Sequence, residues 1–109
     1  MDNLGPEFQE KLKKLSEDYR TKLPERLEKI KEAWRQCSPD NFSDLNYKKL
    51  EKLIHHLAGS GSTFGFPEIS NIAKEIESLL SELNYENFIE HRKQLGLAFK
   101  HLEQIVKKG

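Results

Sequence analysis

Two adjacent histidines followed by closely spaced glycines are the feature of this sequence best suited to do chemistry. The stretch "HHLAGSGSTFG" occupies residues 55–65 and continues a strongly helical segment. A glycine inside a helix costs about 0.5–1 kcal/mol relative to alanine, so Gly59 and Gly61 weaken the helix beside the imidazoles. An exposed imidazole can act as a nucleophile, as an acid or base, or as a metal ligand. The surroundings of each histidine decide among these roles.

Helical geometry separates the two histidines. When the helix is unrolled at about 100° per residue from Leu50, the apolar residues from Leu50 to Leu57 define a core face. His55 falls about 140° from Leu50 and points away from the core, whereas His56 falls about 240° away, on the flank of that face. Because neighbours on a helix point apart, the two are a poor pair of metal ligands. The same projection places four residues beside His55: Lys48, Lys52, Gly59 and Ser62.

The glycines leave His55 uncovered. Side chains on a helix lean toward its N-terminus, so residue i+4 covers the surface over residue i. For His55 that residue is Gly59, which has no side chain, and the residue at i+3 is Ala58. An accessible imidazole flanked by two lysines suits an anionic adduct. We therefore interpret His55 as a histidine that carries a phosphoryl group.

Five stretches with helical periodicity position this site, and none shows the period of two that is typical of a strand. They are approximately residues 6–20 and the stretches that begin at Pro24, near Asp44, at Pro67 and after Asn84. Short connectors between long amphipathic helices favour an antiparallel up-down arrangement. We predict an all-α fold: an antiparallel up-down four-helix bundle over residues 23–108 with an additional N-terminal helix over residues 1–22.

Composition limits the class of protein. The length of 109 residues indicates a single domain over residues 1–109. The 18 Lys and Arg residues balance 18 Asp and Glu residues, so the charge pattern gives no sign of a nucleic-acid binder. The single Cys37 excludes an intramolecular disulfide framework, and no apolar run is long enough to span a membrane. We expect a cytoplasmic protein, and a monomer because the pattern leaves no spare apolar helix face.

The stretch from His55 to Gly65 resembles the signature of histidine-containing phosphotransfer (HPt) domains of bacterial and eukaryotic phosphorelays. In that family the phospho-accepting histidine is followed by a hydrophobic residue two positions on, usually lysine three on, glycine four on, small residues next and glycine ten on. The matching positions here are His55, Leu57, Ala58, Gly59, Ser60 and Gly65. The resemblance covers residues 50–83 closely, including the segment "AKEIE" (73–77), and it selects His55 as the acceptor, in agreement with the helical projection.

The resemblance implies a phosphoryl carrier without an ATP site of its own. His55 would accept a phosphoryl group from the aspartate of a response-regulator receiver domain, or from a histidine kinase, and pass it to another receiver. The family assigns the attack to the distal imidazole nitrogen. The implied partners are receiver domains and a hybrid sensor kinase, and the Mg²⁺ is expected in the receiver, with no cofactor or metal on this chain. "GSGSTFG" lacks the Lys-Ser/Thr ending of a phosphate-binding loop.

Ala58 stands where the family usually has a lysine that helps to neutralise the phosphoryl group. We expect Lys52, a turn before His55, to take over this role, with Lys48 as the second candidate. The docking face is expected to combine exposed residues of two helices: Lys48, Lys52, Ala58, Gly59, Ser62 and Phe66, with Asn71, Lys74 or Glu75. Two alternatives stay open. One is a helical adaptor that binds receiver domains without carrying phosphate, and the other is the phospho-accepting module of a chemotaxis-type histidine kinase.

Overall fold

The computed structural model of the chain describes residues 5–38, 40, 43–83 and 85–108, and every regular element in them is an α-helix. The four helices are α1 (Pro6–Gln36), α2 (Asp44–Thr63), α3 (Pro67–Glu82) and α4 (Tyr85–Lys108). The predicted all-α class is therefore confirmed. Asn84, after which the last helix is predicted to begin, lies outside the described residues. None of the helices, as far as they are described, combines the length and apolar character needed to cross a bilayer.

Local sequence signals set where three of the helices begin. Pro6 and Pro67 occupy the first turns of α1 and α3, where a missing backbone N–H costs little because that group has no partner within the helix. Ser43 caps α2, since its side-chain oxygen accepts a hydrogen bond from the backbone N–H of Asn46 at 3.1 Å. The predicted helix starts near Asp44 and at Pro67 are confirmed.

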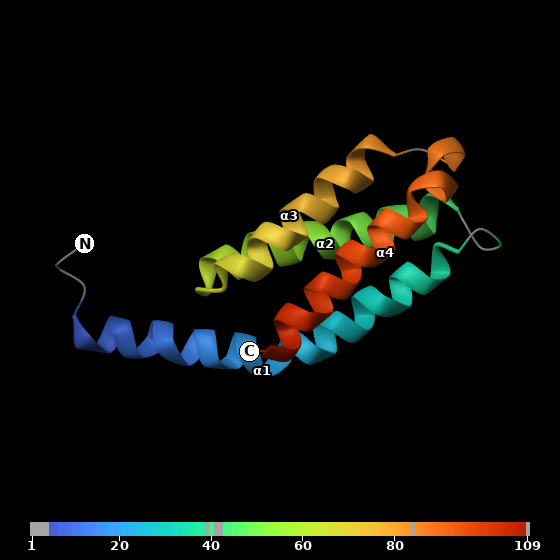
Figure 1. The fold of residues 1–109 in the computed structure, drawn as a ribbon. Coiled ribbons are helices and arrows are strands. Elements are labelled where there is room, and N and C mark those ends of the chain that lie inside the picture. The colour runs from blue at the N-terminus through green and yellow to red at the C-terminus, as the bar shows by residue number, and fades with distance from the viewer. Residues whose placement is uncertain (1–4, 39, 41–42, 84, 109) are drawn as a thin grey trace.

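The predicted break between an N-terminal helix and the bundle is not found. Pro24, expected to open a second helix, lies inside α1, which runs through it without interruption. A proline within a helix removes one backbone hydrogen bond and favours a kink. The buried residues of α1 lie on both sides of it: Tyr19, Leu23, Leu27 and Ile30. Burial on both sides keeps the helix continuous, and Figure 1 shows that α1 changes direction between its blue and teal parts.

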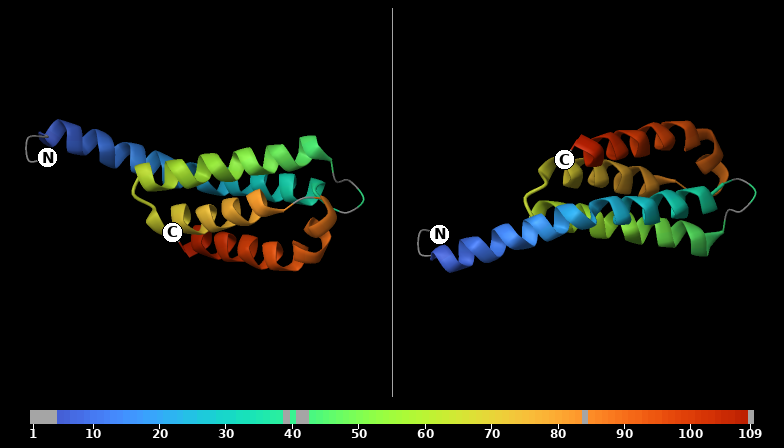
Figure 2. Two further views of the ribbon diagram at one scale, coloured as in Figure 1. Left: turned by 90° about the horizontal axis from the view of Figure 1, so that it is seen from above. Right: turned by 90° about the horizontal axis from the view of Figure 1, so that it is seen from below.

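The four helices form a ring in which each packs against two others. α1 contacts α2 and α4, and α3 contacts the same two helices, with α2 and α3 making the most extensive pair. Apolar residues fill the interior, and the most completely buried include Leu50, Ile54, Ile76, Leu80, Phe88, Leu95 and Leu102. Figure 2 shows that the N-terminal part of α1 extends past the turn between α2 and α3, which lengthens the molecule to 53 × 23 × 22 Å.

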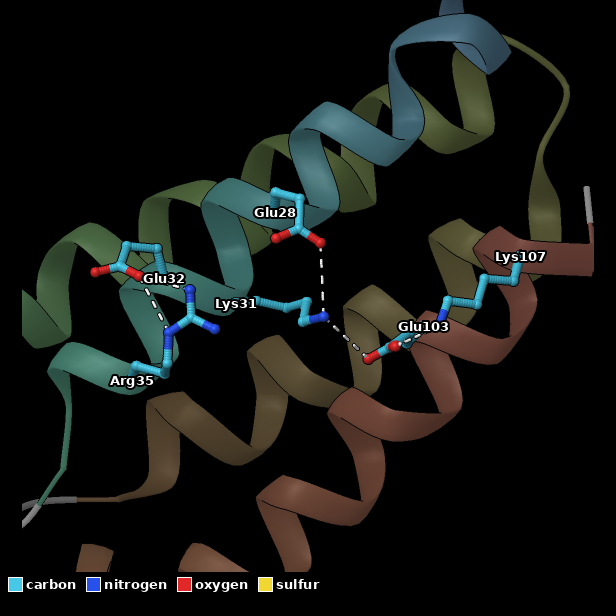
Figure 3. A network of polar contacts seen from close by, with 6 residues as sticks. All are labelled: Glu28, Lys31, Glu32, Arg35, Glu103 and Lys107. Carbon is cyan, nitrogen blue, oxygen red and sulfur yellow. Dashed lines mark hydrogen bonds and ion pairs between the residues drawn. The ribbon is translucent and has the colours of Figure 1, made fainter.

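A small network of ion pairs lies on the outside of the bundle, and one of its pairs joins α1 to α4 (Figure 3). Lys31 of α1 lies 3.5 Å from Glu28 on its own helix and 3.7 Å from Glu103 on α4. The ammonium of Lys107 donates a hydrogen bond to Glu103 at 2.8 Å, and this bond holds the pKa of that carboxyl below its usual range. Exposed ion pairs of this kind contribute little to stability. The apolar interior therefore holds α1 against α4.

Candidate functional site

His55 stands on the outer side of α2 and is open to solvent. Its side chain is 72 % exposed, while the neighbouring Ile54 is fully buried. Gly59, one turn further along the helix, is also exposed, and a Cβ placed on it would meet no atom within 4 Å. Since the residue at i+4 is the one that would cover the imidazole, the space beside the His55 ring is free.

A carboxylate engages one nitrogen of the His55 ring. Nδ1 forms a hydrogen bond with Oε2 of Glu77, a half-buried residue of α3. An ionised carboxylate only accepts hydrogen bonds, so this contact favours the tautomer of the neutral ring that has its proton on Nδ1 and its lone pair on Nε2. The contact therefore orients the ring, and in that tautomer Nε2 is the nitrogen with an available lone pair.

The turn between α2 and α3 brings Glu77 opposite His55. At the end of α2 the N–H of Phe66 donates to the carbonyl of Gly61 at 2.7 Å, a bond typical of a helix that ends at a glycine. The glycine that ends α2 is Gly65, not Gly61. Its φ of 87° is a left-handed conformation that residues with a side chain rarely adopt. His55 and Glu77 lie equally far along the chain from Phe66, so the returning helix carries them to the same level.

Sequence reasoning missed Glu77, although this residue ends the segment "AKEIE" that resembles the next helix of the family. The signal that would have found it is the position of the turn. Once the chain reverses at Gly65 and Phe66, counting equal distances on either side pairs His55 with Glu77.

Close to the histidine, α2 and α3 are in tight contact. A Cβ placed on Gly61 would lie 3.0 Å from the backbone nitrogen of Ser70 and 3.3 Å from the carbonyl oxygen of Phe66. The Ser70 hydroxyl also donates to the carbonyl of Ala58 at 2.6 Å. Gly61 therefore serves the packing of the two helices, whereas Gly59 faces open space.

Tyr47 continues this contact toward the start of α2. Its hydroxyl donates to the carbonyl of Leu80 on α3, and the residue is only 9 % exposed. Burial raises the pKa of Tyr47 to about 12, with smaller contributions from the charges of Glu51 and Cys37. Two surfaces of α2 can now be named: the packed seam consists of Tyr47, Ala58 and Gly61, and the open face consists of His55, Gly59 and Ser62.

The expected exposure of Ala58 is wrong. This residue is 3 % exposed and lies in the packed seam, where its carbonyl accepts the hydrogen bond from Ser70. Its methyl group is covered by α3 and offers no surface to a docking partner. A lysine at this position would have to extend its ammonium group past α3 to reach water.

Lys48 and Lys52 are exposed on α2, and within the described part of the chain neither ammonium group forms a hydrogen bond or an ion pair. Lys52 lines a groove between α1 and α2 together with His56, so it flanks His55 from the side of α1. Lys48 precedes His55 by two turns, which places it on the same side of the helix. Both lysines are free to bind an anion, but neither forms a described hydrogen bond with the imidazole, whose bond is to Glu77.

The three residues of α3 expected at the docking face lie on two different sides of that helix. Lys74 is exposed and lies one turn after Ser70 and one turn before Glu77, both of which bond to α2. It therefore shares the side of α3 that adjoins the open face. Asn71 and Glu75 instead line a groove between α3 and α4, so they do not adjoin it.

Ser62 and Phe66 also differ from each other. Ser62 is exposed on the open face. Phe66 is half-buried, with its ring centroid 5.4 Å from that of Tyr19 and the guanidinium of Arg20 5.6 Å from its centroid. The described contacts of the Phe66 ring are thus with α1 and not with the His55 ring.

The described residues hold no cluster of three or more His, Cys, Asp and Glu side chains that could bind a metal ion. The open face instead offers one uncovered imidazole, in which Nδ1 is bonded to the Glu77 carboxylate and Nε2 is accessible. That combination of an orienting base and an accessible lone pair is suited to nucleophilic attack.

Comparison with known proteins gives one match. The family model described as the Hpt domain matches residues 14–106, which include all of α2 and α3 and most of the other two helices. No curated protein and no solved structure matches the chain.

Proposed function

The chain belongs to the Hpt domain family, and we propose that it is a phosphorelay intermediate with His55 as the phospho-acceptor. Hpt domains are phosphocarrier modules of two-component systems and not catalysts in their own right. The observation that carries the proposal is the His55 ring, which is exposed and bonded to Glu77 through Nδ1. In this role His55 accepts a phosphoryl group from a receiver aspartate or a histidine kinase and passes it to another receiver.

The transfer follows from the tautomer of His55. The lone pair of Nε2 attacks the phosphorus of an aspartyl phosphate, the new N–P bond forms, and the bond from phosphorus to the carboxylate oxygen breaks. The aspartate leaves as a carboxylate, and the imidazole, protonated at Nδ1, gains positive charge. Glu77 stabilises that charge through its hydrogen bond to Nδ1. Transfer to a second receiver is the same step in reverse, with Nε2 as the leaving group.

Charge on the phosphoryl oxygens calls for cations beside His55. Lys52 and Lys48 are the proposed neutralising residues, because both are exposed and free of ion pairs among the described residues. Phosphoryl transfer depends chiefly on positioning and charge stabilisation. These lysines should therefore change the rate of transfer, while His55 stays the residue that is phosphorylated.

The partner is proposed to be a receiver domain that docks on the open face and supplies the Mg²⁺. Gly59 and Ser62 present little bulk there, and Lys74 supplies a cation from α3. We propose that the helices form an antiparallel up-down bundle and that residues 1–109 are one domain. The protein is proposed to act in the cytoplasm and to need no cofactor of its own.

Transfer of a radioactive phosphoryl group from a phosphorylated receiver domain tests the proposal. We expect an acid-labile, base-stable label on the wild-type chain, loss of the label in His55→Gln, and retention of it in the matched variant His56→Gln. If no candidate receiver or histidine kinase labels the wild type, the phosphocarrier proposal fails. The result would instead support the alternative of a helical adaptor that binds receiver domains without carrying phosphate. Labelling that survives in His55→Gln would assign the acceptor elsewhere.

Variants of Glu77 test the mechanism apart from the acceptor. Glu77→Gln keeps an oxygen that can accept from Nδ1 but removes the charge, whereas Glu77→Ala removes both. We expect transfer to slow roughly tenfold in Glu77→Gln and more in Glu77→Ala, because the charge gained by the ring loses its partner. Equal rates in all three proteins would show that this hydrogen bond plays no part in transfer.

A further inference from the structure

The N-terminal part of α1 carries an apolar stripe that the described residues leave exposed. Phe8, Leu12 and Leu15 are 47 %, 44 % and 50 % exposed. They recur at steps of four and three residues and continue, after Leu15, into the buried Tyr19. The stripe is therefore the outward extension of the face that α1 buries in the bundle.

This stripe lies on a stretch of helix that stands clear of the bundle. We call residues 6–18 the overhang, and Figure 2 shows it extending past the turn between α2 and α3 and past the end of α4. The expectation of a monomer rested on the absence of a spare apolar helix face, and the overhang provides such a face. Most of it also precedes residue 14, where the match to the Hpt family begins, so that family's shared features do not explain it.

The charges along the stripe favour a second copy of the same helix as its partner. Lys11 and Asp18 each precede a stripe residue by one position, Leu12 and Tyr19, so they line the same edge of the stripe. Neither forms an ion pair within its own chain among the described residues. In an antiparallel pair centred between residues 13 and 14, Lys11 of each copy lies two residues from the level of Asp18 of the other, on the same edge of the interface. Because each side chain leans toward the N-terminus of its own helix, the two charges converge. In a parallel pair, by contrast, this edge of the stripe meets the opposite edge of the partner helix. Lys11 then lies beside Ser16, and both charges stay unpaired.

The same register places apolar residues opposite one another. Leu12 of one copy meets Leu15 of the other, and Phe8 reaches the level of Tyr19. Just beyond that level a groove of ≈ 740 Å³ opens between α1, the start of α3 and the end of α4. Its apolar lining includes Leu23, Pro24, Phe66, Pro67 and Ile105. The groove thus offers a site for the aromatic ring that the antiparallel register brings to its mouth.

We propose that two copies of this chain associate through their overhangs as an antiparallel helix pair, with Phe8 of each copy seated against the groove of the other. The stripe, the Lys11 and Asp18 edge and the groove all meet in this one register. The pairing places the two bundles at opposite ends of the dimer, so both open faces stay accessible. The proposal does not depend on phosphotransfer by His55.

The association is measured by sedimentation equilibrium of the full chain over a range of concentrations. The short overlap predicts a dissociation constant on the order of tens of micromolar, so the range should extend to about 500 µM. The double variant Leu12→Glu with Leu15→Glu should be monomeric throughout. Leu97→Glu, which changes an equally large residue that is 62 % exposed on α4, is the matched control and should dimerise like the wild type. Circular dichroism checks that each variant keeps its helices.

Charge reversal tests the register. Lys11→Glu and Asp18→Lys should each weaken the dimer roughly tenfold, because each places two like-charged pairs across the interface. The combination of both reversals should restore wild-type association. A wild type that stays monomeric at all concentrations would overturn the proposal, as would a dimer that tolerates glutamate at positions 12 and 15. Weakening by both single reversals without rescue would overturn the antiparallel register. The label-transfer assay on the same variants is expected to be unchanged, so this proposal and the phosphocarrier proposal can fail separately.

Discussion

Gly59 and Gly61 lie two residues apart on α2, yet they meet different surroundings. A side chain at Gly59 would project into open space on the open face, whereas one at Gly61 would press on the backbone of α3 in the packed seam. The first glycine leaves room beside a reactive ring and the second lets two helices approach. The same residue type thus serves access on one side of a helix and packing on the other, and the two roles can be separated by experiment.

The largest difference is expected when a bulky group is placed on the open face. Gly59→Phe puts a ring over the His55 imidazole, because a residue at i+4 leans back over residue i. We expect transfer from a phosphorylated receiver to slow roughly 100-fold, since a displaced partner loses its alignment with Nε2. The free energy of unfolding, measured in urea, should change little. An unchanged transfer rate would show that the space over His55 is not used.

The second-largest effect is expected in the packed seam, where alkaline pH should lower the free energy of unfolding. The pKa of Tyr47 is raised to about 12 in the folded protein, from about 10 when unfolded, so the neutral hydroxyl is favoured by folding. This contribution is complete below about pH 10 and is lost as pH rises through about 12; near pH 11.5 the loss is about 2 kcal/mol. Urea unfolding near pH 8 and near pH 11.5 measures it, with Tyr47→Phe as the reference. If the variant loses as much stability as the wild type, the effect belongs to other groups.

The smallest effects come from adding a single methyl group to each glycine. Gly61→Ala should lower the free energy of unfolding by about 1–2 kcal/mol, because its Cβ would crowd the Ser70 nitrogen at 3.0 Å. Gly59→Ala should raise it by about 0.5–1 kcal/mol, since alanine favours the helix and meets no neighbour. Opposite signs in parallel urea titrations would support the comparison. Equal shifts for the two variants would contradict it.

The starts of α2 and α3 could be predicted from the sequence because each depends on residues within a few positions. Ser43 caps α2 just before Asp44, and Pro67 stands in the first turn of α3. It misplaced a break at Pro24 because the burial that holds α1 together on both sides of the proline is a tertiary effect. The helical projection placed His55 away from the core, and its exposed side chain agrees with that. The prediction that Ala58 is exposed was wrong because a projection of α2 alone does not show which side of that helix α3 covers.

The site itself was only half visible from the sequence. His55 and Gly59 belong to one helix, so their spacing is enough to relate them. Glu77 comes from another helix, and its place beside His55 depends on where the chain turns at Gly65. Contacts between helices of this kind need the geometry of the turn as well as the pattern of each helix.

Pro24 has a mechanical consequence for the chain. Without an N–H at this residue, the carbonyl of Arg20 lacks its usual helical hydrogen bond, which makes this point of α1 easier to bend than its neighbours. The helix from Pro6 to Pro24 is a lever about 27 Å long. A bend of about 10° at its base moves the tip by roughly 5 Å, as the rise per residue and simple trigonometry require. Tyr19 and Leu23, which are buried just before the proline, oppose such a bend, so a swing of the arm about Pro24 must first break their contacts with the bundle.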